Sequence, residues 1–146
     1  MWTYRCKLRR VVDGDTVDVD IDLGFGIWQM NERVRIMGID TPESRTRDKI
    51  EKKFGLAAKA KLKSLLGPNP VLQTTISKKG EDMKGKFGRI LGDFILEDGR
   101  KVTEVLIEEG HAVAYFGGSK DDVDAAHLVN RERLLKEGAV TLPKKK

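Results

Sequence analysis

The sequence has 146 residues, with 28 Lys and Arg against 23 Asp and Glu, and a net charge of +5. That length fits one domain with a sizeable core, and 39% hydrophobic with 35% charged residues is typical of a globular protein. No apolar run approaches the ~20 residues of a membrane span, so we expect no membrane partner. One cysteine and two histidines exclude an internal disulfide and most metal sites built on those residues. Carboxylates and arginines must therefore carry any chemistry.

Local patterns predict five strands and three helices. The expected elements are strands at 4–12, 16–23 and 33–39, a helix at 48–66, strands at 71–77 and 89–96, and helices at 102–109 and 121–136. Short turns join the first three strands into a meander, and residues 78–88 form a long polar loop. We expect one domain over residues 1–142 and a flexible basic tail at 143–146.

The strand at 16–23 has the clearest pattern, because apolar and acidic residues alternate along it without a break. Side chains of a strand point alternately to opposite faces, so one face is apolar and the other is acidic. We expect the acidic face, formed by Asp18, Asp20 and Asp22, to lie against solvent. The loop that follows, residues 24–32, contains four large apolar residues, which we expect to pack on the sheet; the alternative is a contact with a partner.

Five strands, with a helix between the third and the fourth, match the order of an OB-type barrel. The predicted fold class is therefore α+β, mainly β: a five-stranded OB-fold Greek-key barrel with three flanking helices. Such barrels commonly bind oligonucleotides.

Positive charge is concentrated in the middle of the chain. Residues 48–92 hold eleven basic and four acidic side chains, whereas the two flanking regions are nearly balanced. A locally basic segment predicts an anionic partner, with nucleic acid as the first candidate. A solvated, lysine-rich helix face remains the alternative.

Two acidic turns are candidates for a metal site. One is Asp13-Gly14-Asp15-Thr16 before the second strand, and the other is Asp40-Thr41-Pro42-Glu43 after the third. Antiparallel neighbours bring the start of one strand close to the end of the next, so both turns should lie at one end of the barrel. Converging carboxylates need a cation or arginines to offset their repulsion, and hard oxygen ligands suit Ca²⁺ or Mg²⁺. Two turns formed for backbone reasons remain the alternative.

Two arginines are candidates for binding phosphate. Arg35 lies near the Asp40 turn, and Arg89 ends the segment Lys86-Phe87-Gly88-Arg89. A guanidinium pairs bidentately with phosphate oxygens. If side chains alternated strictly along the strand, Arg35 and Asp40 would lie on opposite faces. Both can point into one site only if Gly38 or the end of the strand interrupts that alternation. A surface ion pair is the alternative for each arginine.

Together these segments resemble the staphylococcal nuclease (thermonuclease) family. The resemblance spans roughly residues 5–136 and rests on an ordered set of motifs: residues 12–16, 35–43, 86–89, 99–102 with Glu104, Gly110, and 113–115. It implies an OB-fold barrel and Ca²⁺-dependent hydrolysis of phosphodiester bonds in DNA and RNA. It further implies a preference for single strands and products with 3′-phosphate ends.

The resemblance also implies a role for each matching residue. Asp15 and Asp40 would bind Ca²⁺ through their side chains, and Thr41 through its backbone carbonyl. Glu43 would hold the attacking water and either deprotonate or only orient it, while Arg35 and Arg89 would bind the phosphate and stabilise the transition state. The nucleotide-contacting positions are Lys86, Phe87 and Tyr115; the family often has tyrosine where this chain has Phe87.

The alternative function is a non-catalytic OB-fold module that binds nucleic acid or protein. Degenerate relatives of that kind usually lose the carboxylates and arginines, whereas this chain keeps all five of them, so we favour the nuclease. We expect a monomer. The first residues, Met-Trp-Thr-Tyr-Arg, carry charge where an export signal is apolar, which favours a cytoplasmic location, although the mature form of a secreted protein would read the same.

Overall fold

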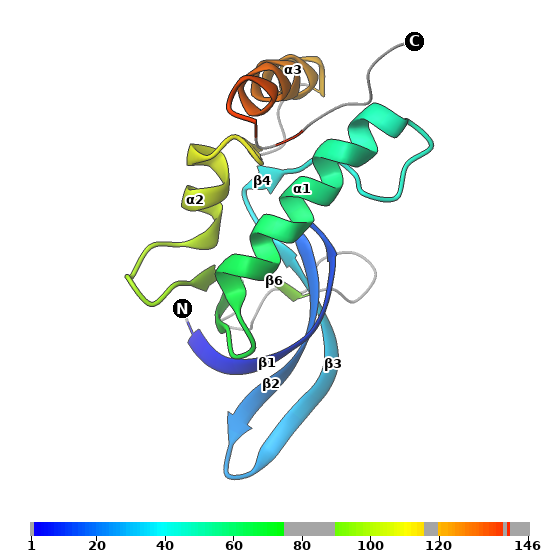
Figure 1. The fold of residues 1–146 in the computed structure, drawn as a ribbon. Coiled ribbons are helices and arrows are strands. Elements are labelled where there is room, and N and C mark those ends of the chain that lie inside the picture. Colours follow the sequence, from blue (N-terminus) through cyan, green and yellow to red (C-terminus); the bar gives the residue numbers. More distant parts are fainter. Residues whose placement is uncertain (1, 75–89, 116–119, 139, 141–146) are drawn as a thin grey trace.

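The computed structural model describes residues 2–74, 90–115, 120–138 and 140, and every structural statement below concerns these residues. Five strands form a closed barrel in the order β1-β2-β3-β6-β5 (Figure 1). Their bounds are β1 Trp2–Asp13, β2 Thr16–Gly24, β3 Ile27–Ile36, β5 Val71–Thr74 and β6 Ile90–Ile95. All neighbours are antiparallel except β3 and β6, which pair in parallel. The predicted five-stranded OB-type barrel is confirmed.

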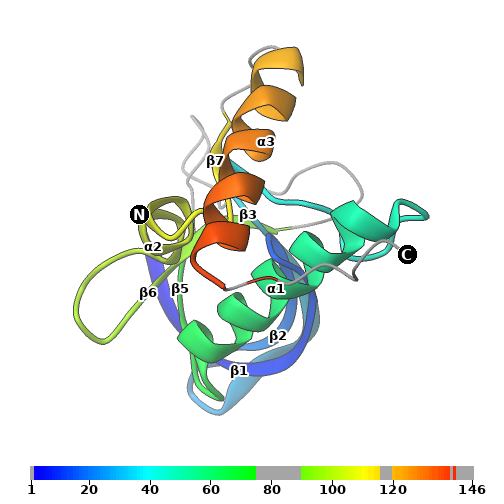
Figure 2. The same ribbon diagram turned by 45° about the horizontal axis from the view of Figure 1, so that its top comes forward.

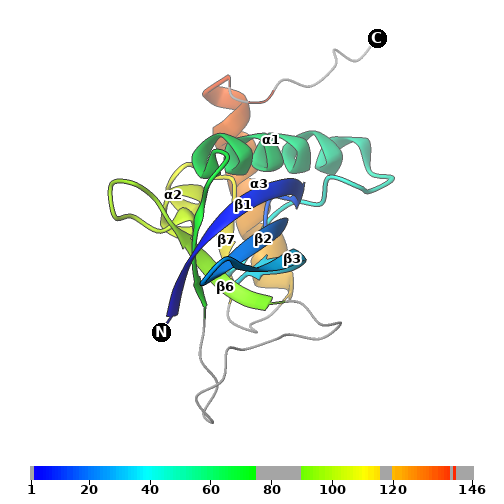
Figure 3. The ribbon, with the colours of Figure 1, turned by 90° about the horizontal axis from the view of Figure 1, so that it is seen from below.

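Three helices flank the barrel, as expected. They are α1 Lys49–Leu66, α2 Val102–Glu108 and α3 Lys120–Lys136. Figure 3 shows α1 lying over β1 along one side of the barrel, and Figure 2 shows α3 extending away from the strands. Helix α1 begins at Asp48, whose carboxylate accepts hydrogen bonds from the free N–H groups of Ile50 and Glu51 at 3.0 and 3.1 Å. No described helix has the length and apolar character needed to cross a membrane.

The barrel core is filled by the apolar face of the strands and by one face of α1. Residues with less than 2% exposure include Val17, Val19, Val34, Leu72 and Phe94 from the strands. From α1 the buried side chains recur every four positions: Phe54, Ala58, Leu62 and Leu66. That spacing places them on one side of the helix, so α1 closes the barrel with an apolar stripe.

Two of the three carboxylates on the acidic face of β2 do not lie against solvent, so that expectation is wrong for Asp18 and Asp20, while Asp22 is half-buried. Asp18 and Asp20 are only 9% and 5% exposed. Arg33 of β3 donates two hydrogen bonds to Asp18, from Nε to Oδ1 at 2.9 Å and from Nη2 to Oδ2 at 3.2 Å. Arg9 of β1 contacts Asp20, with Nε 3.2 Å from Oδ1. Long arginine side chains from both neighbouring strands therefore cover the carboxylates, which alternation within one strand cannot reveal.

Residues 24–32 do not pack on the barrel as expected. Gly24 and Gly26 adopt positive φ angles of 87° and 76° on either side of Phe25, so β2 and β3 continue into a tight hairpin that projects from the barrel (Figure 1). Phe25 at its tip is fully exposed, and Ile27 and Met30 are also exposed, whereas the ring of Trp28 lies under Lys7 of β1, whose Nζ is 4.8 Å from the ring centroid. The β2–β3 pairing satisfies the backbone hydrogen bonds of this segment, so the hairpin can form without packing its apolar side chains on the barrel.

The third predicted strand ends earlier than expected, and a short sheet follows it. After β3 the chain turns at Met37 and Gly38, and Gly38 has a φ of 81°. β4 (Ile39–Asp40) then pairs antiparallel with β7 (Val113–Ala114), which the sequence analysis did not predict. The expected loop at 78–88 and the tail at 143–146 lie outside the described residues.

Candidate active site

The two acidic turns meet at one end of the barrel, which confirms the expectation. The Oδ1 of Asp13 accepts a hydrogen bond from the backbone N–H of Ser44 at 3.0 Å and another from the Ser44 hydroxyl. The same hydroxyl lies 3.4 Å from the carbonyl oxygen of Val12. Ser44 directly follows Glu43, so this contact joins the first turn to the end of the second.

Helix α1 supports both turns through small residues. A Cβ on Gly14 would lie 2.8 Å from the Cβ of Ala58 and 3.1 Å from Oγ1 of Thr41. A Cβ on Gly55 would lie 2.2 Å from the carbonyl oxygen of Glu43. Glycine is therefore required at these positions by close backbone approach, and the packing fixes where Thr41 and Glu43 stand.

Arg35 contacts Asp15 of the first turn and Ile39, which directly precedes the second turn. Its Nη2 is 3.4 Å from Oδ2 of Asp15 and donates to the carbonyl oxygen of Ile39 at 2.9 Å. Its Nη1 donates to the carbonyl oxygen of Ile36. The turn at Gly38 breaks the alternation of β3, so Arg35 reaches the Asp40 side, as the sequence analysis required. A guanidinium has five N–H donors, so the group retains capacity for an anion.

Asp15 is a largely buried carboxylate beside that arginine. Burial raises the pKa of the Asp15 carboxyl, and the positive charge of Arg35 opposes the rise. A bound cation would further stabilise the negative charge of the buried Asp15 carboxylate, which Arg35 alone offsets in part. Asp15 also accepts a hydrogen bond from the Thr16 hydroxyl at 2.9 Å, which orients Oδ1.

The donor groups at this end of the barrel fit a hard divalent cation. Asp15 and Asp40 supply carboxylate oxygens, and the buried hydroxyl of Thr41 lies beside Asp15, where it acts to lower the pKa of that carboxyl. Among the described residues no three His, Cys, Asp or Glu side chains form a metal-binding group. The expected ligand set has only two carboxylates, together with a backbone carbonyl and water, so it does not reach three such side chains. It resembles Ca²⁺ or Mg²⁺ sites that retain water ligands.

Glu43 and Asp40 point toward solvent more than Asp15 does. The Glu43 side chain is exposed, and within the described residues it has no hydrogen-bond partner. The Asp40 side chain is 39% exposed. An exposed carboxylate beside a candidate metal site can hold a water molecule, which is what the predicted role of Glu43 requires.

His127 of α3 contacts Asp40, a contact that no sequence pattern predicted. Its Nε2 lies 2.8 Å from Oδ2 of Asp40, although the two residues are 87 positions apart. No local signal could have revealed this contact, because the pattern around His127 is that of an ordinary helix. The pairing depends on where α3 lies over β4 and β7.

Tyr115 is brought to the same region by the small sheet. It directly follows β7, is exposed, and donates its backbone N–H to the carbonyl oxygen of Gly38 at 2.9 Å. β7 pairs with β4, which contains Asp40. The other predicted binding residues, Lys86, Phe87 and Arg89, lie outside the described residues. β6 begins directly after them, at Ile90, which pairs with Val34.

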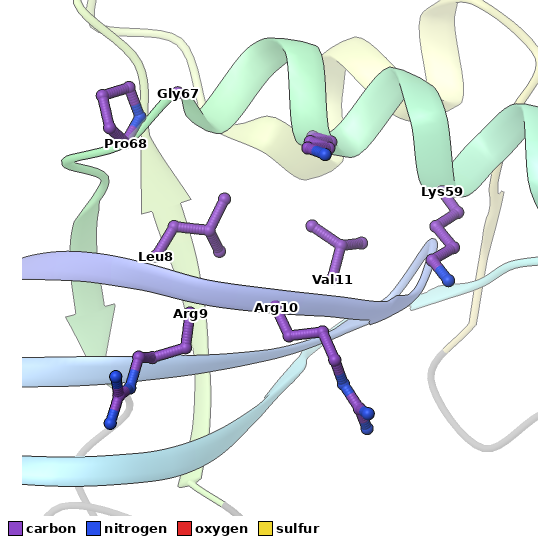
Figure 4. A pocket seen from close by; sticks show the side chains of 8 residues that line it. Leu8, Arg9, Arg10, Val11, Lys59, Gly67 and Pro68 are labelled. Carbon is purple, nitrogen blue, oxygen red and sulfur yellow. The ribbon is translucent and has the colours of Figure 1, made fainter.

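A separate groove lies between β1 and α1 and has a volume of about 570 Å³. Figure 4 shows Leu8 and Val11 pointing toward α1 and Arg9 and Arg10 pointing away from it. Its lining residues include the basic Lys59 but no carboxylate, histidine or hydroxyl side chain. The groove therefore lacks the groups needed for hydrolysis, and the acidic turns remain the candidate active site.

Comparison with known proteins finds relatives that are named as nucleases. The family model described as "Staphylococcal nuclease homologue" matches residues 33–142, a range that includes Arg35, Asp40 and Glu43 but not Asp15. An endonuclease of Bacillus subtilis, YhcR, is 33% identical over 77% of this chain. An uncharacterized endonuclease of Escherichia coli is 30% identical over 94% of this chain, and the thermonuclease of Staphylococcus intermedius is 33% identical over 75% of it.

The extent of the match differs among these relatives. The chain covers 80% of the Escherichia coli protein and 58% of the thermonuclease, but only 9% of YhcR. It also spans 33% and 47% of two further Bacillus subtilis endonucleases. The family model nevertheless matches most of the chain. The chain belongs to the family of staphylococcal nuclease homologues.

Proposed function

We propose that this protein is a Ca²⁺-dependent nuclease that hydrolyses phosphodiester bonds in DNA and RNA. We further propose that it prefers single strands, leaves 3′-phosphate ends and acts as a monomer. The observation that carries the proposal is the contact between Arg35 and Asp15 at the end of the barrel where the turn with Asp40 and Glu43 also lies. The names of the relatives, which include endonucleases and a thermonuclease, support the same reaction class.

In this proposal the metal is held by Asp15, Asp40 and the backbone carbonyl of Thr41. When bound there, Ca²⁺ would supply positive charge that offsets the negative charge of the phosphodiester. Arg35 would donate to the phosphate oxygens, because its guanidinium is already fixed by the carbonyl oxygens of Ile36 and Ile39. Such fixed donors stabilise charge that develops in a transition state without first having to reorganise.

Glu43 would hold the attacking water through its exposed carboxylate. The backbone of Glu43 packs closely on Gly55, and this contact fixes the position of Glu43 relative to Asp40. Arg89 would be the second phosphate-binding arginine, and Lys86 and Phe87 would contact nucleotides. Tyr115 would offer a ring on which a base stacks, a contact that tolerates any sequence. Because basic side chains would neutralise phosphates, substrate affinity should fall steeply with salt.

The proposal is tested with purified protein and a labelled single-stranded oligonucleotide, first with Ca²⁺ and then with excess chelator. We expect cleavage only with Ca²⁺, and end-group analysis should find 3′-phosphates. Binding without cleavage would instead indicate the non-catalytic OB-fold module. Equal cleavage with chelator would exclude the metal dependence.

Two substitutions test the roles of the residues. Glu43→Gln and Arg35→Ala should each lower the cleavage rate by about 100-fold or more, because each removes a group that acts in the transition state. Glu97→Gln is the matched control, since Glu97 is exposed in the turn after β6, and it should cleave like wild type. Circular dichroism should show that all three variants are folded. Unchanged rates in Glu43→Gln would show that its role is assigned wrongly.

A further inference from the structure

We propose that His127 is a positioning residue for Asp40: its imidazole fixes the orientation of the Asp40 carboxylate, so that the other carboxylate oxygen is presented to the metal ion. This inference rests on the proposed function, because it assumes that Asp40 is a metal ligand. It assigns a task to one of the two histidines of the chain and to helix α3.

The contact is short and sheltered on the histidine side. Nε2 of His127 lies 2.8 Å from Oδ2 of Asp40, and the side chains are 12% and 39% exposed, respectively. Within the described residues His127 is the only hydrogen-bond partner of the Asp40 side chain. An ionised carboxylate can only accept, so Nε2 is the donor and carries the proton. The remaining oxygen, Oδ1, faces no competing donor in the described part of the chain.

Contacts on both sides of His127 hold its helix in place. Val123 and Leu134 are buried on the same side of α3 as His127, and Leu134 packs with Phe54 of α1 and Val140. Nδ2 of Asn130 donates to the carbonyl oxygen of Ala112 at 3.3 Å. These contacts fix the backbone of α3, so His127 stays beside Asp40, and its side chain is only 12% exposed.

The backbone of Asp40 is fixed separately. It pairs with Val113 in the β4–β7 sheet, and Ala112, which anchors α3, directly precedes that strand. The Asp40 side chain would still be free to rotate about its χ angles. The bond from His127 removes that freedom, and outer hydrogen bonds of this kind typically change metal affinity by about 10–100-fold.

A purely structural role for His127 is the competing interpretation, because the same bond ties α3 to the barrel end. The two interpretations differ in what an equivalent donor restores. If only helix docking matters, any loss of an α3 contact should have the same effect. If Asp40 is positioned, only variants that lose the N–H donor should weaken metal binding.

The test is isothermal titration of the wild-type protein and three variants with Ca²⁺ alone, without nucleic acid. His127→Ala should raise the Kd for Ca²⁺ by about 10-fold or more. His127→Gln, whose amide nitrogen can donate to the same oxygen, should recover most of the affinity. Asn130→Ala is the matched control; it should lower the thermal midpoint but leave the Kd for Ca²⁺ unchanged.

Three outcomes overturn the inference. His127→Ala could bind Ca²⁺ like wild type, Asn130→Ala could weaken binding as much as His127→Ala, or the wild type could bind no Ca²⁺. The third outcome also removes the metal from the proposed function. A wild type that binds Ca²⁺ but cleaves no oligonucleotide would overturn the proposed function alone and leave the positioning role intact.

Discussion

The backbone of Glu43 lies directly against Gly55 of helix α1. A Cβ at Gly55 would be 2.2 Å from the carbonyl oxygen of Glu43 and 2.6 Å from the backbone nitrogen of Ser44. Both atoms belong to the backbone, so neither can rotate away as a side-chain atom would. The helix that closes the barrel thus also sets the position of the turn that contains the candidate catalytic carboxylate.

Gly55→Ala should therefore destabilise the protein. Alanine favours a helix by about 1 kcal/mol over glycine, but forcing a methyl group into this contact costs about 1–3 kcal/mol and a shift of the turn. We expect a lower urea midpoint and a larger loss of cleavage than the stability change explains. Ala60→Gly, at an exposed position of the same helix, measures the helix propensity alone. A Gly55→Ala protein as stable as wild type would show that the turn yields easily.

The pair of Arg33 and Asp18 should contribute more than a surface ion pair. Asp18 is 9% exposed and receives two hydrogen bonds from Arg33, which raise the pKa of that arginine. We expect a coupling free energy of about 1–3 kcal/mol from a double-mutant cycle with Arg33→Ala and Asp18→Asn, between the values of exposed and buried pairs. The exposed pair of Arg133 and Glu137 is the control and should give about 0.5 kcal/mol or less. Equal couplings would contradict this.

His111 should make the protein less stable in mild acid. Burial lowers the pKa of the imidazole; the charges of Lys61 and Arg133 act in the same direction, and Glu109 and Glu137 act against it. The unfolded chain then binds the proton more readily than the folded one. The stability that the neutral imidazole contributes is present above the unfolded pKa of about 6.5 and is lost as the pH falls through the folded pKa.

The measurement compares urea unfolding of wild type and His111→Gln at pH 8 and pH 5.5. Glutamine cannot take up a proton in this range, so the variant should lose less stability on acidification than wild type. The four charged neighbours are unchanged in the variant. The difference between the two proteins in stability lost on acidification can therefore be assigned to His111. Parallel losses in both proteins would contradict the expectation.

Cys6 should be unreactive in the folded protein. It is 2% exposed, and burial raises the pKa of its thiol to about 12, so almost no thiolate exists at neutral pH. Reaction with dithionitrobenzoate at pH 8 should be slow in buffer and rapid in denaturing urea, so that it reports on unfolding. Cys6→Ala gives the blank. Rapid reaction of the native protein would show that the β1 region opens locally.

Much of the fold was predictable because its signals are local. The alternation in 16–23 marked β2, and the stop at Gly67 marked the end of α1, where the structure has a φ of 63°. The β4–β7 sheet was not predictable, since each strand has two residues and neither has a pattern of its own. The hairpin at 24–32 was misread because its apolar residues suggested packing, whereas its glycines allowed a ladder that stands away from the core.

The site was predictable as a set of turns but not as a set of contacts. The order of the strands places the turns with Asp15 and Asp40 at one end of the barrel, because neighbouring antiparallel strands share their ends. The contact between His127 and Asp40 spans 87 positions and exists only because α3 is anchored at Asn130 and Leu134. No local pattern contains that information.

The sequence by itself determined the five barrel strands, the three helices and the two acidic turns, because hydrophobic period and turn residues act over a few positions. Tertiary structure decided three other features. It buried Asp18 and Asp20 under arginines of neighbouring strands, it placed His127 on Asp40, and it brought Tyr115 beside Gly38 through β7. Each of these depends on side chains or strands that meet only when distant segments of the chain pack together, and no short-range preference specifies such a meeting.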